Sequence, residues 1–223
     1  MNQSPVPNLL TSLTGPLHDL EKIMLANQMK IEHWFRHQWQ AAEPPFYSSV
    51  DLRNSGFKMA PVDTNLFPAG FNNLNPNFLP LCVQAVHATI AEVCPNLKKI
   101  LLVPESHTRN QMYFENLAAL QTILEKSGLE VRIGSVREDL KQPQEHQAPS
   151  GRKVIIEPLI REGNHIGVAG FKSCVVLLNN DLSDGVPDIL QNLEQIILPS
   201  LHIGWNSRLK SQHFGHYAFA SMA

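Results

Sequence analysis

A strand–helix–strand pattern near the middle of the chain limits the possible folds most. Residues 98–103, KKILLV, form a short apolar run of the kind that a buried parallel strand shows. The next segment should be a helix that ends near Gly128, and residues 129–136 return as a second strand. The predicted helix places four apolar residues on one stripe: Tyr113, Leu117, Leu120 and Leu124. Such a unit joins parallel strands, so the pattern predicts an α/β fold with an open, mainly parallel sheet flanked by helices.

The rest of the chain supplies further elements of the same kind. Thr14 is a candidate N-cap for a first helix that runs from Pro16 to about residue 40. Residues 153–160 and 165–168 flank Arg161–Asn164 and are typical of a hairpin, whereas the polar segment 137–152 is expected to be an exposed connection. The other predicted elements are a helix over 81–93, a buried strand over 173–178, a short helix over 186–193 and a strand over 196–198.

The long segment Phe46–Asn73 has no sustained helical or strand period, and prolines and glycines interrupt it. Irregular segments of this length are uncommon inside compact domains, and the ordered ones are usually functional. Disordered segments are poor in aromatic residues, whereas this one contains Tyr47 and several phenylalanines. We therefore predict a mostly irregular, ordered polar loop.

This segment offers the opposite charges that an amino-acid ligand requires. Arginine and lysine can hold a carboxylate, aspartate can hold an ammonium group, and asparagine amides can complete the site. Turn geometry and a local Asp51–Arg53 ion pair would explain the same residues without a ligand. The candidate substrate-binding residues here are Asp51, Arg53, Lys58, Asp63, Asn65, Asn72 and Asn73.

Two further polar blocks follow predicted strands, where open α/β sheets bind their ligands. The first block also begins a helix, whose N-terminus favours an anion, although Ser106 or Thr108 could be only an N-cap. No glycine-rich phosphate loop is present, so this part of the chain is not expected to hold a nucleotide alone. The candidate residues are Glu105, His107, Thr108 and Arg109 in the first block, and Asn179, Asn180 and Asp181 in the second.

Composition excludes several classes of protein. The 223 residues carry 18 Lys and Arg against 20 Asp and Glu, so no strong charge favours nucleic acid or an anionic membrane. The three cysteines, Cys82, Cys94 and Cys174, have no metal-binding or redox spacing and are interpreted as core residues. The histidines also lack zinc-site spacing, so no metal site is predicted. Without a signal peptide or a long apolar span, the sequence predicts a cytoplasmic protein of unspecified oligomeric state.

Four sequence blocks together resemble a known family. They are SSVDLRNSGFKMAPVDTNLFPAGFNN at 48–73, VPESHTRN at 103–110, LLNNDLS at 177–183 and GWNSRLKSQHF at 204–214. The blocks are long and unusual, and the likeness extends to about Tyr217. On these blocks the chain resembles the proteobacterial form of glutamate-cysteine ligase, which belongs to the ATP-grasp ligases.

The resemblance implies an enzyme that makes γ-glutamylcysteine from glutamate, cysteine and ATP with Mg²⁺. Family chains continue into an ATP-grasp domain, so we expect this chain to supply only a substrate-side, pre-ATP-grasp-like portion that is inactive alone, with ATP and Mg²⁺ bound mainly by the other half. The implied organisation is a leader and helix at 1–45, an α/β domain at 46–217 and an atypical tail at 218–223. Residues near the junction that could face phosphates are Arg208, Lys210 and His213.

Two other functions remain compatible with the residues themselves. The same sheet could carry a non-catalytic module that binds or senses an amino acid. A sugar-nucleotide or phosphosugar enzyme is a third reading, because an α/β fold alone does not define a reaction.

Overall fold

The computed structural model describes residues 14–41, 45–55, 59–106 and 110–201. The chain divides into two compact units, which are described separately. The first consists of Met1–Pro45 and Ser49–Thr64, and the second of Phe46–Ser48 and Asn65–Ala223. No helix within the described ranges is both long and apolar enough to span a membrane.

The first unit contains two helices and a two-stranded sheet. Helix α1 spans Pro16–Ala26 and helix α2 spans Gln28–Ala41, so the single predicted helix is divided at Asn27. The Asn27 side chain donates to the Ile23 carbonyl at 2.8 Å, which competes with continued helical bonding. The prediction of Thr14 as N-cap is wrong, because Gly15 takes this position with a φ of 88°.

Strands β1 (Ser49–Asn54) and β2 (Met59–Asn65) form the small sheet of the first unit. The prediction of a mostly irregular segment is therefore wrong for these residues. In β1, Val50 and Leu52 alternate with Asp51 and Arg53, but both apolar side chains are exposed. An alternation this short, with no buried face, does not distinguish a strand from a loop.

The second unit is built on a six-stranded sheet with the order β11-β10-β3-β4-β6-β5. Only β5 runs antiparallel to its neighbour; the other four pairings are parallel, which confirms the predicted mainly parallel α/β fold. The strands are β3 (Lys99–Pro104), β4 (Glu130–Ser135), β5 (Gln144–Gln147), β6 (Lys153–Pro158), β10 (Val175–Asn179) and β11 (Ile196–Leu198).

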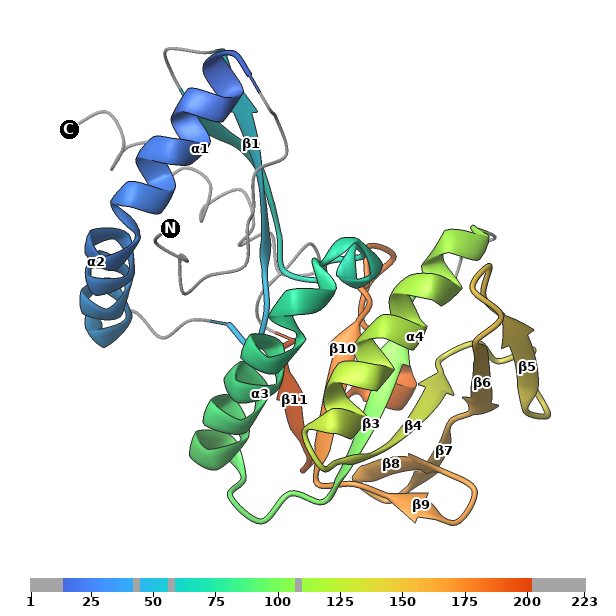
Figure 1. The fold of residues 1–223 in the computed structure, drawn as a ribbon. Coiled ribbons are helices and arrows are strands. Elements are labelled where there is room, and N and C mark those ends of the chain that lie inside the picture. The colour runs from blue at the N-terminus through green and yellow to red at the C-terminus, as the bar shows by residue number, and fades with distance from the viewer. Residues whose placement is uncertain (1–13, 42–44, 56–58, 107–109, 202–223) are drawn as a thin grey trace. The chain divides into compact units, whose positions relative to one another are not determined.

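One face of this sheet packs against two helices. Helix α3 (Leu79–Val93) and helix α4 (Gln111–Lys126) lie side by side on it (Figure 1). Alternate strand residues such as Ile100, Leu102 and Leu177 join the helices in one fully buried cluster. Because both faces of the strands are covered, the strands read as continuous apolar runs.

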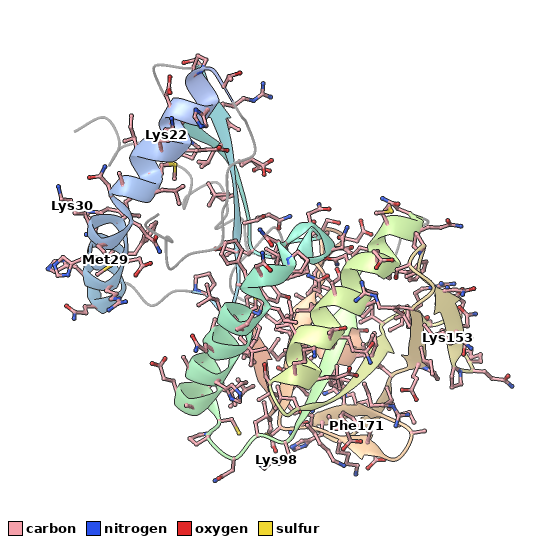
Figure 2. The ribbon with its side chains drawn as sticks, in the orientation of Figure 1. Lys22, Met29, Lys30, Lys98, Lys153 and Phe171 are labelled. Atoms are coloured by element: carbon pink, nitrogen blue, oxygen red, sulfur yellow. The ribbon has the colours of Figure 1, made fainter. Side chains whose placement is uncertain are left out.

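The opposite face packs against a second, smaller sheet instead of further helices. This sheet consists of β7 (Ile160–Glu162), β8 (His165–Val168) and β9 (Phe171–Lys172). Phe171 on β9 (Figure 2) is buried in a cluster with Leu101 and Val176 of the main sheet. Gly167 is required in β8, since a Cβ there would lie 2.3 Å from the Phe171 carbonyl oxygen. The expectation of flanking helices therefore holds for one face of the described sheet only.

Several boundaries differ from the sequence predictions. Segment 137–152 contains the edge strand β5, so it is not simply an exposed connection, and Leu140 and Ala148 are buried. The predicted strand 153–160 is divided between β6 of the main sheet and β7 of the small one, although the β7–β8 hairpin is confirmed. The helix predicted at 186–193 is only a 3₁₀ turn, η3, at Asp188–Leu190. Two other such turns, η1 (Phe71–Asn73) and η2 (Pro76–Phe78), precede α3.

Candidate functional site

The strand order places a topological switch point between β3 and β10. From β3 the chain continues to β4 and β6 on one side of the sheet, and it later returns to β10 on the other side. In open α/β sheets, the crevice beyond the carboxyl ends of such strands is the usual ligand site. Pro104 and Asn179, the last residues of β3 and β10, lie opposite each other in register. The two polar blocks predicted from the sequence both begin at this point.

A hollow of about 660 Å³ opens beside the end of β3. This volume is within the usual range for small-molecule sites. Asn72, Asn73 and Glu105, which the sequence analysis selected, lie together on its wall. The remaining lining residues are Ala69, Asn110, Met112 and Tyr113.

Asn110 connects this hollow to helix α4. It is the N-cap residue, and its side-chain oxygen accepts a hydrogen bond from the Met112 amide at 2.9 Å. The prediction that the first block begins a helix is confirmed, but the capping residue is Asn110. The N-terminus of α4, which is the positive end of the helix dipole, and Glu105 therefore both border this hollow.

A buried network of polar side chains supports the hollow. The Tyr113 hydroxyl accepts a hydrogen bond from the Glu105 amide at 2.7 Å and lies 3.0 Å from the Asn179 carbonyl oxygen, to which it donates. The fully buried Asn116 donates to the Asn179 side chain at 3.3 Å and accepts from the Phe71 amide at 3.0 Å. Asn179 in turn donates to the Pro68 carbonyl at 2.9 Å. This network joins three segments that are distant in sequence.

Burial determines the protonation of the two tyrosines in this region. Desolvation raises the pKa of Tyr47 and of Tyr113 far above that of an exposed tyrosine. The Tyr47 hydroxyl donates to the Leu178 carbonyl. Both phenols therefore remain neutral hydrogen-bond donors, and neither is suited to act as a base near neutral pH.

The second polar block fixes the loop after β10 against the loop after β3. Asn180 donates to the Pro104 carbonyl at 3.0 Å, and a Glu105 carboxylate oxygen accepts from the Asp181 amide at 3.1 Å. Asn179 and Asn180 are only 1% and 4% exposed, so their amides connect chain segments beneath the surface of the hollow. Asp181 is half-buried and accepts from the Ser183 amide at 3.0 Å.

The asparagines before α3 have local partners. The Asn65 side chain accepts from the Phe67 amide at 2.8 Å, which is the turn geometry considered as the alternative to ligand binding. Asn72 donates to the Asn73 side chain at 3.1 Å on the wall of the hollow.

The remaining candidate residues either belong to the first unit or lie outside the described residues. Asp51, Arg53 and Asp63 are exposed on β1 and β2, in the first unit. A second set lies outside the described residues: Lys58, His107, Thr108, Arg109, Arg208, Lys210 and His213.

Sequence reasoning missed Tyr113 and Asn116 as members of the site. Tyr113 was placed on the apolar stripe of the helix, and it is indeed buried there. The available signal was that a hydroxyl and an amide, three positions apart on a buried helical face, both need hydrogen-bond partners. Those partners come from Glu105, from β10 and from Phe71, and pairing over the longer of these sequence distances cannot be read from a single chain.

Among the residues that the structure describes, no three or more His, Cys, Asp or Glu side chains gather as a metal site.

Comparison with known proteins adds the family to this geometry. The family model GshA, described as glutamate-cysteine ligase, matches residues 21–222. Among solved structures, the chain is similar to one from Methylobacillus flagellatus KT described as "Putative gamma-glutamylcysteine synthetase", with 55% identity and a TM-score of 0.81. That match covers 96% of this chain and 50% of the other, so this chain spans half the length of that relative. No match was found among curated proteins. The resemblance noted in the sequence is confirmed, and the chain belongs to the glutamate-cysteine ligase family.

Proposed function

We propose that this chain forms the glutamate-binding portion of a glutamate-cysteine ligase, which makes γ-glutamylcysteine in the first step of glutathione biosynthesis. The observation that carries the proposal is the hollow at the switch point, lined by Asn72, Asn73 and Glu105 in a member of this family. Such a place is where an α/β sheet offers a ligand the most convergent polar groups.

The chemistry of the lining suits a zwitterionic amino acid. The Glu105 carboxylate can hold the ammonium group of glutamate through a charge-assisted hydrogen bond. The amides of Asn72 and Asn73 and the N-terminus of α4 can donate to a substrate carboxylate. Tyr113 holds the Glu105 backbone, so the carboxylate is positioned before the substrate arrives.

ATP supplies the activation in such a ligation, because phosphorylation of the γ-carboxyl creates an acyl phosphate that the amine of cysteine can attack. We assign no described residue to the nucleotide. The chain corresponds to half of its solved relative, so we expect residues 1–223 to bind glutamate but not to catalyse ligation by themselves.

Calorimetry with glutamate tests the binding part. Glu105→Gln should weaken glutamate binding at least about tenfold, because a charge-assisted hydrogen bond contributes about 1.5–3 kcal/mol. Glu145→Gln is the matched control, since Glu145 is exposed on the edge strand β5 and pairs with Lys153. Equal affinity in wild type and Glu105→Gln would contradict the proposed site.

A chimera tests the catalytic part and separates it from the amino-acid-binding alternative. Residues 1–201 would be joined to the corresponding remainder of the Methylobacillus relative, and ADP release with glutamate and cysteine would be followed. Turnover that falls with Glu105→Gln supports a ligase. A chimera that binds glutamate but releases no ADP would favour the non-catalytic module. Robust turnover by residues 1–223 alone would contradict the expectation that this chain does not catalyse ligation by itself.

A further inference from the structure

Two cysteines that are far apart in sequence meet at the amino end of the main sheet. The Sγ atoms of Cys94 and Cys174 lie 3.4 Å apart, although 80 positions separate the residues. Both are free thiols. The interpretation of all three cysteines as core residues is wrong for Cys174, because Cys174 is exposed. Cys94 is half-buried and packs against the hydrophobic cluster that contains Val86 and Ile90 of α3.

The backbone on both sides of this pair is fixed by hydrogen bonds. Cys94 caps the C-terminus of α3: its amide donates to the Ile90 carbonyl at 2.9 Å, and its carbonyl accepts from the Leu97 amide at 2.9 Å. Cys174 immediately precedes β10, and its carbonyl accepts from the Ile196 amide at 2.9 Å. The short distance between the sulfur atoms therefore brings the C-terminal end of α3 beside the start of β10.

We propose that Cys94 and Cys174 form a reversible intrachain disulfide site that is oxidised by small-molecule disulfides such as glutathione disulfide. A disulfide bond is about 2.0 Å long, so the sulfur atoms need to approach by roughly 1.4 Å, which small side-chain rotations can provide. The third cysteine, Cys82, lies within α3, away from the C-cap position. This inference is independent of the proposed ligation.

The exposure of the two thiols sets the order of the exchange. The exposed Cys174 thiolate attacks one sulfur of the small disulfide and expels the other half as a thiolate, which leaves a mixed disulfide on Cys174. Cys94, after losing its proton, attacks Sγ of Cys174 and expels the second small thiolate. The leaving thiolates take up the two protons. Two electrons pass from the protein dithiol to the small disulfide, which becomes two small thiols.

The surroundings of Cys174 determine how fast this exchange runs. Although Cys174 is exposed, partial desolvation of its sulfur first, and then the hydrogen bond with Cys94, raise the pKa of the Cys174 thiol. The thiolate fraction at neutral pH is accordingly small, and the reaction should take hours.

Mass spectrometry of the whole chain after incubation with glutathione disulfide tests the site. The expected product has lost two hydrogen atoms and yields, without reduction, a linked peptide pair that contains Cys94 and Cys174. Cys82→Ser should give the same link. Cys94→Ser should stop at a mixed disulfide on Cys174, because the resolving thiol is missing. A wild-type chain that also stops at the mixed disulfide would overturn the proposal.

A thermal measurement gives an independent check. Closing a loop of this length should raise the unfolding midpoint by roughly 5 °C or more relative to the reduced chain. Cys82→Ser should keep the whole increase, whereas Cys94→Ser should lose it. A lower midpoint on oxidation would show that the native backbone cannot accommodate the bond, which also overturns the proposal.

Discussion

Individual residues at the carboxyl end of the sheet do most to shape the candidate site. Tyr113 and Asn116 bring together β10, the Glu105 loop and residues 68–71 through buried hydrogen bonds. Within the described part of the chain, no buried side-chain nitrogen or oxygen atom lacks a hydrogen-bond partner. A buried network in which every group has a partner is sensitive to the loss of any one member, since the partner left behind remains desolvated.

Tyr113→Phe should show this sensitivity. It removes one hydroxyl and leaves the Glu105 amide without its acceptor, so we expect a loss of about 2 kcal/mol in the free energy of unfolding, measured by urea denaturation. Thr89→Val is the control, because the Thr89 hydroxyl only donates to the Ala85 carbonyl of its own helix. The control should change stability by less than about 0.5 kcal/mol. Equal effects of the two variants would show that the network contributes no special stability.

At the scale of elements, the sequence predicted the parts that local pattern determines. The apolar runs at β3 and β10 and the stripe on α4 gave the parallel core. Gly128 is the left-handed residue just after α4, with a φ of 80°. The pairing of β5 with β6 was missed, because QEHQ has no apolar alternation and becomes a strand only through its neighbour. The position of the two polar blocks after buried strands was predicted, but the partners of Asn179 were not, since they depend on tertiary contacts.

An ion pair attaches α4 to the turn between β5 and β6, and it should make stability depend on pH. The pKa of Glu115 is lowered from 4.5 to about 2. The main cause is the hydrogen bond from the Arg152 guanidinium, and the second is the hydrogen bond from the Ser150 amide. Because the pKa of Glu115 is lower in the folded chain than in the unfolded chain, the ion pair contributes its full stability at pH values above the unfolded pKa. This contribution is lost as the pH falls from about 4.5 towards 2.

Arg152→Gln tests this assignment by urea denaturation across pH 2–6. The variant should be less stable than wild type at pH 6, and the difference should shrink as Glu115 becomes protonated in both proteins. Arg161→Gln is the control, because Arg161 donates to the Gly163 and Asp188 carbonyls, which do not titrate. A wild-type minus Arg152→Gln difference that is constant over this range would refute the role of Glu115.

At the scale of the whole molecule, the buried hydrophobic core of the described residues lies in the second unit. Every buried residue of its two core clusters lies between Phe67 and Leu190. The sequence predicted this α/β region. It did not indicate that β1 and β2 would belong to the same unit as the N-terminal helices, or that Phe46–Ser48 would belong to the second unit. Only contacts between distant segments define such a division.

A polypeptide of residues 65–223 should therefore fold independently. We expect one cooperative thermal transition, with a midpoint several degrees below that of the whole chain because Phe46 and Tyr47 no longer pack on the core. Circular dichroism during heating measures this. A fragment with helical signal but no cooperative transition would indicate that the first unit is needed for the fold.

The antiparallel strand β5 has a consequence for the behaviour of concentrated solutions. Any exposed edge strand presents unpaired amides and carbonyls on which another molecule could add a strand. Here that side of the sheet ends in four polar residues, Gln144–Gln147, and Glu145 is paired with Lys153 at 2.8 Å. Such a short, hydrophilic border discourages intermolecular strand addition and so protects an otherwise highly apolar sheet from aggregation.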